Sequence, residues 1–159
     1  MQGVDPRMLA AGIAAAVVIC DQLTKTWALH HAVLDRHVIG PLYLTLVFNR
    51  GAAFGLGAGV GPIVEAVVVC LVVAIVAFGR RAGRRRSRVL GVGLGLLVGG
   101  AMGNLVDRAI RHEHGAVIDF VQAARVGNRD YWPVFNLADA SVVLGAISLA
   151  LVLSRRNSQ

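Results

Sequence analysis

The sequence is poor in charged residues, aromatic residues and cysteine. Charged residues make up 16% of the 159 residues and aromatic residues 6%, whereas hydrophobic residues reach 56%. The two cysteines, Cys20 and Cys70, both lie inside apolar runs, where a thiol packs as a small hydrophobe. We therefore expect both cysteines in the apolar core and no disulfide framework. The mean hydropathy of +0.66 indicates a single integral membrane domain, residues 1–159.

The sequence also lacks a dispersed positive charge, although its formal net charge is +7. The excess is accounted for by arginines clustered in residues 80–88 and by Arg155 and Arg156 near the end of the chain. A nucleic-acid-binding protein would spread its basic residues over a face and interleave them with aromatic residues. Binding to nucleic acid is therefore not expected.

The first apolar stretch, residues 8–20, lacks the features of a cleavable signal peptide. Ile19 is large where a cleavage site requires a small residue, and the apolar character resumes beyond Asp21. We interpret this stretch as part of a retained first span.

Four segments are apolar enough to cross a hydrocarbon core of about 30 Å, which takes roughly 20 helical residues. They cover approximately residues 9–30, 60–78, 89–110 and 134–153. Arginine-rich short loops stay in the cytoplasm, so we place the loop between the second and third spans and both termini inside the cell. The connections then lie outside, and residues 43–48, rich in β-branched and aromatic side chains, predict a strand there. We expect an all-α membrane bundle of four transmembrane helices with a small extracytoplasmic β-rich cradle.

Charged and polar residues inside the apolar spans are costly in lipid and tend to face the interior of a bundle. Asp21 and Lys25 lie four residues apart on one helical face, which favours a buried ion pair. Asn104, Asp107 and Arg108 share a face at the end of a run of small residues. That face can form a structural hydrogen-bond network, or Arg108 can hold a phosphate or carbonyl group of a substrate.

Two further acids, Asp119 and Asp139, are expected near the outer membrane surface. Asp119 has apolar neighbours on both sides, and Asp139 follows Asn136 by three residues at the start of the last span, with Pro133 expected in the first turn. If the two carboxyls converge at low dielectric they cannot both ionise, so one keeps a proton while the other activates water. That is aspartic protease chemistry, but a proton relay or a structural pair is equally consistent with these residues.

Metal and nucleotide sites are weakly supported. His112, Glu113 and His114 form no larger cluster and favour a solvated loop over a metal site. Residues 49–55 contain small residues but lack the Lys-Ser ending of a phosphate-binding loop.

Taken together, the polar motifs resemble those of the bacterial lipoprotein signal peptidase family, also called signal peptidase II. The matching residues are Asp21 with Lys25, Asn49-x-Gly51-Ala52-Ala53-Phe54-Gly55, Gly103-Asn104-x-x-Asp107-Arg108, Val117-Ile118-Asp119-Phe120, and Phe135-Asn136-x-Ala138-Asp139. Each motif is weak alone, but five in this order across most of the chain are specific.

The resemblance implies an aspartic endopeptidase of the bacterial plasma membrane that removes the signal peptide from a diacylglyceryl-modified prolipoprotein. Asp119 and Asp139 would be its catalytic dyad. The substrate pocket would contain Asn49, Gly51, Asn104, Arg108 and Asn136, supported by Asp21, Lys25 and Asp107. The resemblance also implies no metal or organic cofactor, contact with membrane lipid, and inhibition by globomycin-type peptides. We further expect a monomer.

Other membrane functions fit the sequence less well. A small transporter or proton channel would distribute ionisable groups through the depth of the membrane, whereas here they gather toward one side. Presenilin-type and prepilin-type peptidases carry a Gly-x-Gly-Asp motif, which this sequence lacks. A non-enzymatic scaffold would tolerate replacement of either Asp119 or Asp139.

Overall fold

A computed structural model describes residues 5–31, 36–50, 88–111, 115–126 and 129–156. Several features singled out in the sequence lie outside these residues, namely Gly51, the predicted second span 60–78 with Cys70, arginines 80–86, and residues 112–114.

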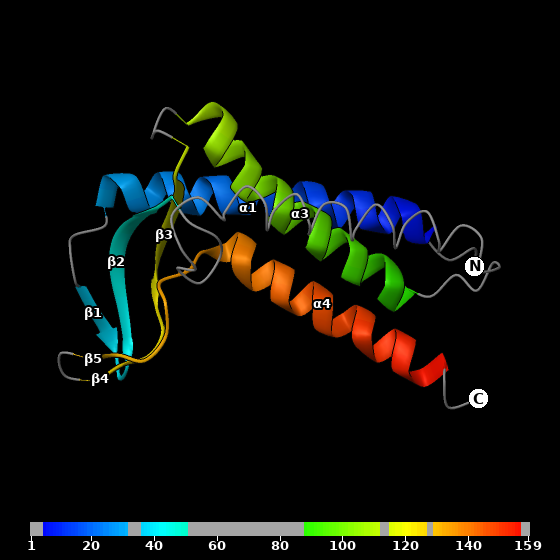
Figure 1. The fold of residues 1–159 in the computed structure, drawn as a ribbon. Coiled ribbons are helices and arrows are strands. Elements are labelled where there is room, and N and C mark those ends of the chain that lie inside the picture. The colour runs from blue at the N-terminus through cyan, green and yellow to red at the C-terminus, as the bar shows by residue number, and fades with distance from the viewer. Residues whose placement is uncertain (1–4, 32–35, 51–87, 112–114, 127–128, 157–159) are drawn as a thin grey trace.

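Three packed helices form the body of the described structure, α1 (Pro6–His31), α3 (Arg88–Ile110) and α4 (Leu137–Arg156). Helices α1 and α3 run in the same direction and α4 runs back between the same two ends (Figure 1). Among the described helices, α1 and α3 are long and apolar enough to cross a membrane, and α4 contains a shorter apolar stretch, Leu137–Val152. These helices correspond to the predicted spans 9–30, 89–110 and 134–153.

The prediction that the last helix begins at residue 134, with Pro133 in its first turn, was wrong. Phe135 still pairs with strand β3 (Val117–Gln122), since its N–H donates to the carbonyl of Val121 at 3.0 Å and its carbonyl accepts the N–H of Val121 at 2.9 Å. The helix therefore begins only at Leu137.

A small antiparallel sheet lies at one end of the helices (Figure 1). Its three strands, in the order β1-β2-β3, are β1 (Arg36–Ile39), β2 (Leu42–Asn49) and β3, and a separate two-stranded ribbon pairs β4 (Arg125–Val126) with β5 (Arg129–Asp130). Strand β2 confirms the strand predicted at residues 43–48. Gly40 turns the chain between β1 and β2 with φ of 54°, a conformation that glycine adopts without steric cost. In the register of the sheet, Asp119 on β3 lies opposite Val47 on β2.

Glycines on α3 allow the helix backbones to approach closely. A Cβ atom on Gly91, Gly95 or Gly99 would lie 2.7 Å from an atom of α1, and one on Gly103 would lie 2.7 Å from the Asp21 carboxylate. The four-residue spacing places these glycines on one face of α3, the small-residue pattern by which helices pack in lipid. On another face, Gly100 contacts the backbone of α4 at Ala138. These contacts bring the polar ends of the three helices together.

The expectation that Cys20 packs in the core was wrong, because it lies on the exposed surface of α1. Large apolar residues are exposed on the same helix, including Met8, Ile19 and Leu23. An apolar run on a helix long enough to cross a bilayer is therefore no evidence that each of its residues packs inside the protein.

Candidate active site

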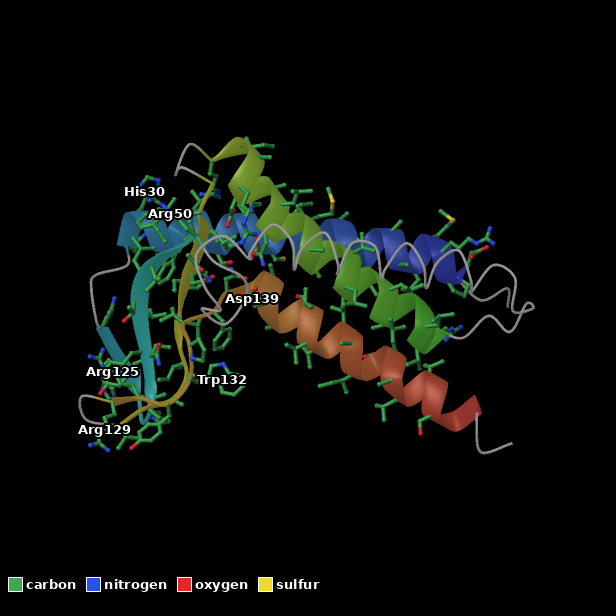
Figure 2. The ribbon with its side chains drawn as sticks, viewed as in Figure 1. His30, Arg50, Arg125, Arg129, Trp132 and Asp139 are labelled. Atoms are coloured by element: carbon green, nitrogen blue, oxygen red, sulfur yellow. The ribbon has the colours of Figure 1, made fainter. Side chains whose placement is uncertain are left out.

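The buried polar residues gather where the three helices meet the sheet. Seven residues singled out in the sequence are buried there: Asp21, Lys25, Asn104, Asp107, Asp119, Asn136 and Asp139. Figure 2 shows Asp139 at the start of α4, beside the strands. Buried charges and amides are tolerated only when they are paired or hydrogen-bonded, so the contacts within this cluster determine what it can do.

Asp139 is placed by a reciprocal cap at the N-terminus of α4. The side-chain oxygen of Asn136, the residue before the helix, accepts the N–H of Asp139 at 2.9 Å. In return, Asp139 Oδ2 accepts the N–H of Asn136 at 3.3 Å. This is the geometry of a capping box, in which two residues three apart satisfy each other's backbone donors. The first turn also presents the positive end of the helix dipole to the Asp139 carboxylate.

Asp119 lies on β3 and approaches the N-terminus of α4 from the sheet. Its side chain accepts two amide hydrogen bonds, from Asn49 Nδ2 on β2 at 2.9 Å and from Asn136 Nδ2 at 2.7 Å. Asn136 therefore contacts both acids, through Nδ2 to Asp119 and through Oδ1 to the backbone of Asp139. The convergence of Asp119 and Asp139, which the sequence left open, is present in the structure.

A second amide approaches Asp139 from α3. Asn104 Nδ2 donates to Asp139 Oδ1 at 2.8 Å, and Asn104 Oδ1 accepts from Asn136 Nδ2 at 3.2 Å. Arg108, one turn along α3, is half-buried and lies near enough to both acids for its charge to act on them. The two acids are thus surrounded by amide donors and one guanidinium.

The environment of Asp119 favours its protonated form. Burial, together with the negative charge of Asp139, raises the pKa of Asp119 from an ordinary value of 3.8 to about 7. Hydrogen bonds from Asn49 and Asn136 and the positive charge of Lys25 oppose this rise. A carboxyl with this pKa keeps its proton in a large fraction of molecules at neutral pH. The second carboxyl, that of Asp139, lies on the other side of the Asn136 side chain.

The family model described as signal peptidase (SPase) II matches residues 13–155, nearly the whole chain. The chain belongs to the signal peptidase II family. It is therefore an aspartic peptidase and a membrane enzyme, as the sequence motifs predicted.

Relatives and solved structures agree with this assignment. The lipoprotein signal peptidase of Syntrophomonas wolfei is 39% identical over 141 residues, covering 86% of this chain and 87% of the relative. That of Caulobacter vibrioides is 36% identical over 151 residues, covering 90% and 84%. A solved bacterial membrane enzyme superposes with a TM-score of 0.74 at 30% identity, covering 94% of this chain and 89% of that one.

In this signal peptidase II chain, two residues that the sequence analysis did not select also contact the buried cluster. Gln22 Nε2 donates to Asp107 Oδ1 at 2.8 Å, and Gln22 Oε1 accepts from Arg111 Nε at 3.0 Å. Arg111 also lies 3.4 Å from Asp107 Oδ1. The four-residue spacing of Asp107 and Arg111 is visible in the sequence and could have indicated this pair. Gln22 carries no such signal.

Proposed function

We propose that this signal peptidase II removes the signal peptide from a diacylglyceryl-modified prolipoprotein by activating water between Asp119 and Asp139. The observation that supports the two roles is the buried convergence of both carboxyls on Asn136. Asn49, Asn104 and Asn136, which donate to the two acids, carry no titratable proton, so acid–base chemistry at this point falls to the carboxyls. In this proposal Asn49, Asn104 and Asn136 orient the acids, and Arg108 binds the substrate backbone.

The proposed reaction uses one proton shared by the pair. The ionised carboxyl accepts a proton from water as the water oxygen attacks the carbonyl carbon of the scissile bond. The protonated carboxyl donates its proton to the carbonyl oxygen. The carboxyl that accepted the water proton then donates it to the leaving nitrogen, and the other carboxyl takes a proton back from the tetrahedral hydroxyl as the C–N bond breaks. Because the acids interact strongly, their titration belongs to the pair.

We also propose four spans with both termini in the cytoplasm and the site at the extracytoplasmic face. The parallel course of α1 and α3 supports a return crossing between them, for which residues 60–78 are the apolar candidate. The arginines of residues 80–88 support a cytoplasmic location for the end of the bundle away from the sheet. Gly51 as a pocket residue, binding of globomycin-type inhibitors, contact with lipid and a monomeric state remain part of this proposal.

The proposed substrate is tested with two peptides that share one prolipoprotein cleavage sequence and differ only in the diacylglyceryl group on the cysteine. We expect the purified enzyme in liposomes to release the signal peptide from the lipidated form, detected by mass spectrometry. The unmodified form should remain uncut over the same period. Equal cleavage of both peptides would show that the lipid is not recognised, and cleavage of neither would contradict the proposed function.

The raised pKa of Asp119 predicts the alkaline side of the pH profile. Asp119 carries its proton below about pH 7 and loses it as the pH rises through that value. The pair then loses the shared proton that the reaction needs, so we expect kcat to fall about tenfold for each pH unit above this midpoint. The measurement is kcat for the lipidated peptide between pH 5 and 9, and a rate that stays constant to pH 9 would contradict the shared proton.

A further inference from the structure

A buried ion triad lies next to the two acids. Lys25 Nζ lies 2.7 Å from Asp21 Oδ2 and 2.7 Å from Asp107 Oδ2, and all three side chains are 0% exposed. The ion pair of Asp21 and Lys25 was predicted from their spacing, but the second carboxylate, from α3, was not. Lys25 therefore joins α1 to α3.

The two carboxylates of the triad also hold the backbone next to each acid, Asp21 through its second oxygen and Asp107 through the same Oδ2 that pairs with Lys25. Asp21 Oδ1 accepts the N–H of Ala138, the residue before Asp139, at 3.0 Å. Asp107 Oδ2 accepts the N–H of Ile118, the residue before Asp119, at 3.1 Å. The two carboxylates of the triad thus bind the backbone N–H groups of the residues just before Asp139 and Asp119.

A third contact runs from the centre of the triad to Asp139. Lys25 Nζ donates to Asn104 Oδ1 at 3.0 Å, and Asn104 Nδ2 donates to Asp139 Oδ1 at 2.8 Å. Because Asn104 Oδ1 is occupied by Lys25, the amide group is oriented with its NH₂ toward Asp139. Lys25 thus orients this amide together with Asn136 Nδ2, which donates to the same oxygen at 3.2 Å.

We propose that Lys25 is a positioning residue, which fixes the separation of Asp119 and Asp139 by clamping Asp21 and Asp107 and by orienting Asn104. This role of the triad rests on the proposed catalytic roles of Asp119 and Asp139, whose separation it would hold. Helix packing alone would not need these charges, because well-packed apolar residues replace a buried ion pair at little or no cost in stability. The N–H of Ala138, by contrast, is a first-turn donor of α4 that needs an acceptor, and Asp21 supplies it.

Replacing Lys25 by methionine keeps much of the side-chain volume and removes the charge. We expect kcat for the lipidated peptide to fall about 100-fold, because a displacement of about 1 Å in a reacting group has an effect of this size. KM should change by less than about threefold, since no triad atom is proposed to contact the substrate. The alkaline limb of the pH profile should also move to higher pH, because the charge of Lys25 opposes the raised pKa of Asp119.

The neighbouring residue Thr24 provides the control. Within the described part of the chain, its hydroxyl bonds to two carbonyls of α1, those of Cys20 and Asp21. Thr24→Ala should leave kcat and the pH profile unchanged. An unchanged kcat in Lys25→Met, a loss confined to KM, or a fixed alkaline limb would overturn the positioning role. The wild-type protein is measured in the same assay. If it cleaves the lipidated peptide, the proposed function holds and the variants test the role of Lys25 alone.

A second pair of variants tests the clamp even if Lys25→Met does not fold. Asp21→Asn keeps a side-chain oxygen that can accept the N–H of Ala138, whereas Asp21→Leu does not. We expect kcat to stay within about tenfold of wild type in Asp21→Asn and to fall about 100-fold in Asp21→Leu. Helix content and thermal unfolding in detergent verify folding of both proteins, and equal kcat values in two folded variants would overturn the proposal.

Discussion

Asp119→Asn and Asp139→Asn should each lower kcat for a lipidated prolipoprotein peptide by at least about 10³-fold without preventing folding. Asparagine has nearly the size of aspartate but can neither hold the shared proton nor accept one from water. It can still accept a hydrogen bond from Asn136 at position 119, or from Asn104 at position 139, so the packing of the site is largely kept. The measurement is turnover in liposomes that contain equal amounts of inserted protein.

The matched control for both variants is Asp5→Asn, the same chemical change just before α1, at the end of the bundle away from the sheet. It should cleave the peptide at the wild-type rate. The double variant of Asp119 and Asp139 should lose little more than either single variant, because residues that act as one unit are not additive. Cleavage at the wild-type rate by either single variant would show that the two acids are not a catalytic pair.

Hydropathy predicted the helices better than it predicted the sheet. Residues 9–30 and 89–110 closely match α1 and α3, because a segment that crosses lipid has to be both long and apolar. The start of α4 was misplaced because the pairing of Phe135 with Val121 is a contact between separate segments, and no local pattern encodes it. The order of the strands was likewise not available from the sequence.

The candidate site was predictable only in part for the same reason. Polar residues in apolar surroundings identified Asp119 and Asp139, and a four-residue spacing identified Asp21 with Lys25. Their convergence depends on contacts between helices and strands far apart in the chain. Neither the Asn49 contact with Asp119 nor the placement of Gln22 against α3 could be derived from spacing.

Asn136 connects the folding of α4 to the chemistry of the site. Its Oδ1 caps the helix by accepting the N–H of Asp139, while its Nδ2 donates to Asp119. The capping task needs only an acceptor, but the contact with Asp119 needs a donor on the second terminal atom of the side chain. Serine preserves the first function and loses the second, whereas alanine loses both.

This difference predicts separate effects on stability and turnover. Asn136→Ala should lower the free energy of unfolding by about 1 kcal/mol more than Asn136→Ser, because both variants lose the buried hydrogen bonds of Nδ2 and alanine also loses the cap. Both should lower kcat about 100-fold, because neither serine nor alanine can donate the hydrogen bond that holds the Asp119 side chain next to Asp139. The measurements are denaturant unfolding in detergent and single-turnover cleavage. If Asn136→Ser turned over the peptide at the wild-type rate, the amide would serve only as a cap, and the proton-sharing pair would have to be held together by Asn49 and Asn104 alone.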